Sequence, residues 1–324
     1  MKRIVLGHVA FVVIFILLTS LTAGAQNYPT KAIRFIVAQQ PGSQNDIVSR
    51  LIAPRLAEVL GQPVVVDNRP GAGGALGFEL AAQAPRDGYT IAMGSISTLG
   101  VLPNMPKKPK YDVLKDFLPV TLVSKSPYIV VVNPMVPANT FKEFVALAKK
   151  RKGGMNYATS GIGTGVHLTT EMFQLASGIE MVHVPYKGAA PGNVALLSGE
   201  VQVMFSNMMP AVNYVRAGRL RALAVTSIQR SAAVPEVPTV SESGYPDFES
   251  TSWQGVVVRA GASPEVVAQL NREIVKILNM PEVKSAIEGE GNIVIANSPQ
   301  QFTDFIRTES KKLGEVIKFA RIEQ

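Results

Sequence analysis

The sequence of 324 residues lacks cysteine and has only three histidines, so it offers little from which a catalytic or metal centre could be built. Without cysteine it can form no disulfide, no thiol nucleophile and no thiolate metal site. After residue 25 the histidines are His167 and His183, whose spacing matches no metal-site pattern. No Gly-x-Ser-x-Gly or Walker sequence occurs, and the two glycine-rich loops carry Leu76 and Val166 where a dinucleotide site needs its third glycine. The sequence therefore contains no recognisable catalytic motif.

The N-terminus has the three parts of a secretory signal peptide. Two basic residues follow Met1, residues 9–18 form an almost unbroken apolar run, and Ala23-Gly24-Ala25 offers the small residues that a signal peptidase recognises. The run is too short to span a bilayer comfortably, although an uncleaved signal anchor is the alternative. We expect residues 1–25 to be removed by cleavage near the bond between Ala25 and Gln26, which leaves a periplasmic protein.

Charged residues are sparse, at 17% against 47% hydrophobic residues, and this composition indicates a well-packed protein of two ordinary domains. The formal net charge is +8, and it falls by two to +6 when the signal peptide is removed with its two basic residues. Such a balance can favour nucleic acid, an anionic membrane or acidic small molecules. Since an exported protein rarely meets nucleic acid, we expect no nucleic-acid partner.

The segment after the signal peptide alternates between strand and helix patterns. Residues 33–37 read as a strand, and Asn45 or Asp46 can cap a helix that Gly61 ends. Pro54 lies inside this helix and should kink or split it, because proline removes a backbone donor. Further strands at residues 64–66 and 89–93, with a helix between them, complete a βαβαβ pattern that predicts a parallel sheet.

A second α/β series begins with a buried strand at residues 128–132 and ends before a similar strand at residues 253–259. Between them the pattern predicts four further strands and three helices, and three more helices finish the chain. The two similar strands suggest two crossings between domains. We therefore expect lobe 1 to comprise residues 26–127 with 250–324, and lobe 2 to comprise residues 128–249.

Two loops connect a predicted strand to the start of a predicted helix, one in each lobe: residues 41–46 and residues 160–165. A helix N-terminus presents unpaired amide donors and a partial positive charge, so it attracts carboxylates and phosphates. In open α/β sheets these junctions lie at the carboxyl ends of the strands, where crevices form. The two junctions could grip an anion from both sides, or they could be ordinary loops with ordinary caps.

Several motifs in a fixed order resemble the extracytoplasmic solute receptors of the tripartite tricarboxylate transporter family, the Bug-type binding proteins. The resemblance begins at Tyr28-Pro29 and runs to the C-terminus. Its markers are Asp67-Asn68-Arg69-Pro70-Gly71-Ala72-Gly73-Gly74, Pro85-Arg86-Asp87-Gly88-Tyr89, Lys115-Asp116-Phe117, Val182-His183-Val184-Pro185-Tyr186-Lys187-Gly188 and Arg221-Ala222-Leu223-Ala224-Val225-Thr226.

This resemblance implies a type II periplasmic-binding-protein fold, α/β in class, with two lobes joined by two crossover strands around a ligand cleft. It implies that a ligand carboxylate is held at the two junctions, and it requires no cofactor and no metal. The implied ligand-binding residues are Gln39, Gly42, Ser43, Asn45, Asp46, Ser95, Ser160, Gly163, Thr164, Gly165, His167, Tyr186, Lys187 and Ser206. For His167 and Asp46 the alternative is a role in packing or helix capping, and for Lys187 it is a solvated surface charge.

The first loop departs from the family pattern Pro-Phe-x-Pro-Gly-Gly. Gln39 stands where the aromatic residue is usual, Ser43 replaces a glycine, and Ser206 stands where many members carry aspartate. A lost acid and added amides favour a polar di- or tricarboxylate over a ligand that bears an ammonium group. We expect a monomeric receptor that passes this ligand to the membrane components of a tripartite tricarboxylate transporter. A sensor for a signalling protein and an exported enzyme are the alternatives.

Overall fold

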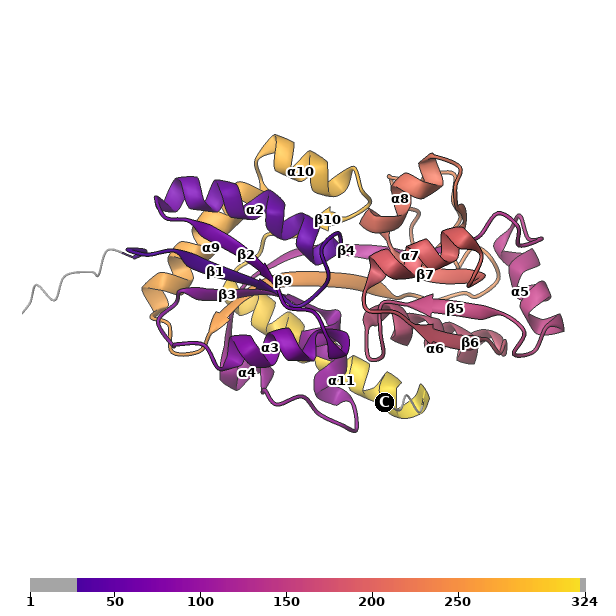
Figure 1. Ribbon diagram of the computed structural model, residues 1–324, viewed down its shortest axis with the longest axis horizontal. Helices are drawn as coiled ribbons and strands as arrows, with labels where there is room; N and C mark the ends of the chain where they lie inside the picture. Colours follow the sequence, from indigo (N-terminus) through magenta and orange to yellow (C-terminus); the bar gives the residue numbers. More distant parts are fainter. Residues whose placement is uncertain (1–27, 321–324) are drawn as a thin grey trace, which may run out of the picture.

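The computed structural model describes residues 28–320, whose strands form a ten-stranded sheet running through two α/β halves (Figure 1). The expected signal peptide lies outside the described residues. The strands are β1 (Ile33–Val37), β2 (Val64–Asn68), β3 (Thr90–Ser95), β4 (Phe117–Val132), β5 (Asn156–Thr159), β6 (Val182–Pro185), β7 (Val203–Asn207), β8 (Arg221–Val225), β9 (Thr251–Arg259) and β10 (Ile293–Val294). Their main order is β2-β1-β3-β9-β4-β7-β5-β6, and β8 and β10 pair with β4.

Helices cover both faces of the sheet in each half (Figure 1). The α-helices are α2 (Gln44–Leu60), α3 (Ala75–Ala82), α4 (Val113–Asp116), α5 (Phe141–Lys150), α6 (Gly165–Ser177), α7 (Ala189–Ser198), α8 (Met208–Arg216), α9 (Pro264–Leu278), α10 (Pro281–Glu288) and α11 (Pro299–Ala320). Two 3₁₀ turns, η1 (Ala72–Gly74) and η3 (Leu102–Asn104), and one π-helical segment, η2 (Ile96–Val101), complete the described part of the chain.

Strands β4 and β9 run antiparallel to each other and connect the two halves (Figure 1). The first part of β4 pairs with β9 and β10, and its last five residues, 128–132, pair with β7 and β8. The paired strands of each set are parallel, as expected for strand–helix–strand units: β1, β2 and β3 in the first half, and β5, β6 and β7 in the second. This arrangement confirms the predicted α/β fold of two lobes joined by two crossover strands.

The first lobe has its apolar core on both faces of the sheet because successive side chains of a strand point to opposite faces. In β1, Ile33 and Phe35 pack in the cluster that contains α2 and α9, whereas Ile36 packs in the cluster of α3 and α11. The C-terminal helices α9 and α11 therefore lie against the first strands of the chain. The lobe boundaries at residues 127/128 and 249/250 stay a prediction.

The second lobe repeats this layering. Alternate residues of β4 separate in the same way, with Val130 in the cluster of α5 and α6 and Ile129 in the cluster of α7 and α8. Phe173 of α6 lies at the centre of the first cluster, where its ring packs against Phe141 and Phe205. Within the described residues no helix is both long enough and apolar enough to cross a membrane.

One local expectation was wrong, and a second was wrong in part. Ser43, rather than Asn45 or Asp46, is the N-cap of α2, because the helix begins at Gln44, two or three residues earlier than expected, and the Ser43 hydroxyl accepts a hydrogen bond from the amide of Asp46. The helix is not split at Pro54, which lies on its exposed face, and the alternative of a kink there stays a prediction. There, water can hydrate the carbonyl group that proline leaves without an intrahelical donor.

Candidate functional site

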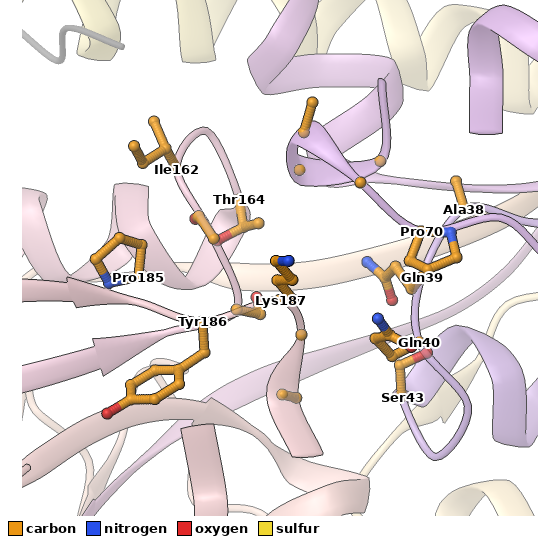
Figure 2. A pocket seen from close by; sticks show the side chains of 18 of the residues that line it. Ala38, Gln39, Gln40, Ser43, Pro70, Ile162, Thr164, Pro185, Tyr186 and Lys187 are labelled. Carbon is orange, nitrogen blue, oxygen red and sulfur yellow. The ribbon is translucent and has the colours of Figure 1, made fainter. Parts of the chain in front are cut away.

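A cavity of about 620 Å³ lies between the two lobes, at the carboxyl ends of the parallel strands (Figure 2). Its walls are the loops that follow β1, β2, β5, β6 and β7. The lining residues are Ala38, Gln39, Gln40, Ser43, Pro70, Gly71, Ala72, Gly73, Gly74, Leu76, Ser160, Gly161, Ile162, Thr164, Pro185, Tyr186, Lys187, Gly188, Ala189 and Asn207. This is the place where open α/β sheets bind ligands.

Each wall loop leads into a helix, so five helix N-termini surround the cavity: those of α2, α3, α6, α7 and α8. Side chains cap two of them, since Ser43 caps α2 and Thr164 caps α6. Helices α3, α7 and α8 begin without a side-chain cap hydrogen bond. The amide groups and partial positive charges at these ends favour an anion in the cavity.

The first predicted junction is held together by the buried carboxylate of Asp46. This carboxylate accepts hydrogen bonds from the Gly42 amide, Arg50 Nε and Asn68 Nδ2, each at 2.9 Å. Burial would raise the pKa of Asp46, but the hydrogen bonds from Arg50, Gly42 and Asn68 outweigh burial, so the pKa lies below its ordinary value. Asp46 therefore holds the loop in place, and its carboxylate is not among the groups that line the cavity.

The second predicted junction is organised by Thr164. Its hydroxyl donates to the carbonyl of Gly161 at 2.8 Å and accepts from the amide of His167 at 3.3 Å. The Gly165 amide donates to Ser97 Oγ of the first lobe at 3.1 Å. Since the Thr164 proton and the Gly165 amide already have protein partners, these two groups shape the loop in this structure.

His167 supports the same loop from inside the second lobe. Its ring stacks on His183 with 4.2 Å between centroids, and His183 stacks in turn on Tyr157 at 4.9 Å. The Gly163 amide donates to His167 Nδ1 at 3.4 Å, so this nitrogen carries no proton. Burial and then the neighbouring His183 lower the pKa of His167 to about 4. A neutral His167 therefore acts as a hydrogen-bond acceptor behind the cavity wall.

Lys187 is the one charged side chain among the residues that line the cavity. It lies on the loop between β6 and α7, and none of the described acidic side chains is within ion-pair distance of it. The neighbouring Tyr186 points elsewhere, as its hydroxyl donates to Glu200 at 2.8 Å. Burial, this hydrogen bond and the Glu200 charge raise the pKa of Tyr186 to about 12. The cavity wall thus carries one cation and no acid.

The two lobes approach each other closely at two glycines that line the cavity. A Cβ atom added to Gly73 would lie 2.7 Å from the carbonyl oxygen of Ile162 in the opposite lobe. A Cβ atom added to Gly188 would lie 2.9 Å from Cγ of Gln40. Contacts this close leave no room for a side chain, so both positions require glycine for the lobes to approach as they do.

The predicted site residues fall into two groups. Those that line the cavity are Gln39, Ser43, Ser160, Thr164, Tyr186 and Lys187. Those that are not among the lining residues are Gly42, which is exposed, and Asn45, Asp46, Ser95, Gly163, Gly165, His167 and Ser206. Ser206, for example, is fully buried and directs its hydroxyl to Asn193 Oδ1 at 3.5 Å, and the buried Ser95 hydroxyl has no partner within the described residues.

Sequence reasoning missed the wall formed by residues 70–74 and Leu76. The glycines of this loop were considered only to exclude a dinucleotide site. The signal that predicts their position is that the loop is a third strand-to-helix junction on the same parallel sheet. Within residues 28–320, no three histidine or acidic side chains are grouped so that they could hold a metal ion.

This fold and cavity define a solute-binding protein of the periplasmic type. The chain belongs to the receptors of the tripartite tricarboxylate transporter family, whose model matches residues 48–322. Protein BugT of Bordetella pertussis is 36% identical over 316 residues, which cover 95% of this chain and 96% of BugT. The resemblance seen in the sequence motifs is therefore confirmed.

Solved structures of similar proteins share the whole architecture. An R. palustris protein with adipate has a TM-score of 0.89 and 31% identity, and the match covers 91% of this chain and 99% of that one. MatC from Rhodopseudomonas palustris with bound malate has a TM-score of 0.86 and 28% identity, covering 90% of this chain and 100% of MatC. Both of these similar proteins were solved with small dicarboxylates.

Proposed function

We propose that this protein is a periplasmic receptor that binds a small di- or tricarboxylate between its lobes and delivers it to the membrane components of a tripartite tricarboxylate transporter. One observation carries the proposal: the inter-lobe cavity is bordered by five helix N-termini and contains a lysine but no acidic side chain. Every electrostatic feature of the wall favours an anion.

The chemistry of the wall supports binding without catalysis. The side chains that line the cavity are amides, hydroxyls, one ammonium group and apolar groups. Among the described residues, no histidine or carboxylate side chain hydrogen-bonds the hydroxyl of Ser43, Ser160 or Thr164, and general-base activation is what a serine or threonine nucleophile requires. The receptor function needs no cofactor, and we propose that the exported monomer acts alone until it meets its membrane partner.

The relatives support the ligand class. The proteins similar to this chain that were solved with adipate and malate bind two-carboxylate acids. The departures at Gln39, Ser43 and Ser206 remove an aromatic ring and an acid from the positions where they are usual in the family. We propose that Gln39 and Ser43, which line the cavity, adapt it to a compact, fully anionic solute, and that the absence of an acid at Ser206 removes a negative charge from behind the wall.

The binding test uses the purified mature protein after denaturation and refolding, which removes any ligand carried from the cell. Thermal unfolding is measured with succinate, malate, adipate and citrate. A ligand at a thousandfold excess over its Kd adds about 4 kcal/mol to the free energy of unfolding, so a binder shifts the melting temperature by several degrees. Absence of any shift across this panel would contradict the proposal.

A matched pair of variants locates the ligand. Gln40→Trp fills space in the cavity wall and should abolish the shift, whereas Gln83→Trp, on the exposed end of α3, should leave it unchanged. In cells, loss of the protein should abolish uptake of the acid that binds. Normal uptake together with a lost transcriptional response to that acid would favour a sensor instead.

A further inference from the structure

Lys187 differs from every other residue that lines the cavity because it carries a full charge. In the view of Figure 2 its side chain lies between the loop that carries Thr164 and the loop that carries Gln39 and Gln40. It is exposed to the cavity, and no described acidic group forms an ion pair with it. The charge therefore has no partner within residues 28–320.

The residue next to Lys187 is bound to an acid, whereas Lys187 itself is not. Glu200 accepts the hydrogen bond of the Tyr186 hydroxyl at 2.8 Å, and it forms no ion pair with Lys187. The contact of Gly188 with Gln40 closes one side of the cavity beside Lys187. The structure thus positions a solvent-exposed ammonium group, with no ion-pair partner among the described residues, on the wall of the cavity between the lobes.

A ligand that covers this ammonium group without supplying a counter-ion is disfavoured, because binding removes the water that solvates the charge. A monocarboxylate carries one negative charge, and the helix N-termini of the wall already bind that charge. It would leave the ammonium group of Lys187 without an anionic partner. A second carboxylate on the same solute supplies that partner, because it can form a charge-assisted hydrogen bond with the ammonium group of Lys187.

We propose that Lys187 is the specificity-determining residue of the receptor: it pairs with the second carboxylate of the solute and selects dianions over monoanions. This inference rests on the proposed carboxylate-binding function. It assigns selectivity to one side chain, whereas the helix N-termini contribute to the binding of any carboxylate. The same ammonium group disfavours solutes that carry an amino group close to the second carboxylate.

The test compares acids that differ only in the second carboxylate: adipate with hexanoate, and succinate with butyrate. Calorimetry at low ionic strength measures the Kd of each acid for the wild type, Lys187→Met and Lys187→Arg. Methionine keeps the length of the side chain without its charge. Loss of a charge-assisted hydrogen bond should weaken diacid binding about ten- to a hundredfold, leave monoacid binding within about twofold, and be largely restored by arginine.

Lys149→Met is the matched control, because Lys149 is exposed on α5 and does not line the cavity. It should change neither Kd, and thermal unfolding should show that all variants are folded. Equal losses for diacid and monoacid in Lys187→Met, or no loss for either, would overturn the role of Lys187. Wild-type protein that binds hexanoate as tightly as adipate would overturn the selectivity and leave the receptor function intact. Protein that binds none of these acids would overturn both proposals.

Discussion

The contact between Gly73 and Ile162 allows the arrangement of the lobes to be tested directly. Gly73 has a φ of +66°, and a Cβ atom there would lie 2.7 Å from the Ile162 carbonyl oxygen across the cavity. The substitution Gly73→Ala therefore has two effects. It places alanine in the left-handed region, and it pushes the lobes apart where they enclose the cavity.

The two effects can be separated by size and by a control. The left-handed backbone should cost about 1–2 kcal/mol of folding free energy. The overlap with Ile162 should cost a further 1–3 kcal/mol or so in the closed arrangement, which weakens ligand binding about five- to 150-fold. Gly61→Ala is a close control, because Gly61 also has a φ of +66° but nothing lies within 4 Å of its added Cβ atom.

Urea unfolding and calorimetry with adipate or malate give the two quantities for each variant. Both variants should lose similar amounts of unfolding free energy, and Gly73→Ala alone should lose affinity. If the two variants bind the acid equally well, the approach of residue 73 to Ile162 is not part of the ligand-binding arrangement, and the reasoning from this contact is refuted.

Two further predictions concern the second junction. Thr164→Ala and Thr140→Ala each remove a helix cap and should each cost about 1 kcal/mol in urea unfolding, but only Thr164→Ala should weaken ligand binding, because Thr164 also holds the cavity loop. Burial and His183 hold the pKa of His167 near 4, below its value of about 6.5 in the unfolded chain, so the unfolded chain binds more protons between these pH values. The free energy of unfolding should therefore fall by about 3 kcal/mol as the pH falls from 6.5 to 4, and His167→Asn, which can still accept from the Gly163 amide, should flatten this part of the pH curve.

Much of the fold could be predicted because its signals are local and periodic. The strand β1 alternates its apolar residues between two cores, and Gly61 ends its helix as expected, in the left-handed conformation that glycine adopts at low cost. The early part of β4 was missed because Pro119 and Pro127 interrupt its strand pattern. The register shift between Pro119 and Thr121 accommodates the first of these prolines, and only the pairing with β9 reveals the strand.

The site was predicted unevenly for a physical reason. Helices α2 and α6 begin with Ser43 and Thr164, and these hydroxyl residues mark a helix start in the sequence. Helices α3, α7 and α8 begin without a side-chain cap, so no local pattern identified their N-termini as walls of the same cavity. The capped ends are the ones whose donors are partly used within the protein. The pattern that makes a helix start easy to recognise therefore also reduces the number of donors it leaves for a ligand.

Affinity and selectivity consequently depend on different parts of the molecule. The helix N-termini around the cavity are backbone features that the parallel strands position, and no truncation of a side chain removes them. Substitutions at Ser43 or Thr164 act on these donors indirectly, through the conformation of the loops they cap. The ammonium group of Lys187 can be removed by a single change without disturbing a strand or a helix. A receptor built in this way can keep its hold on one carboxylate while the side chains that surround the rest of the solute determine which acid it accepts.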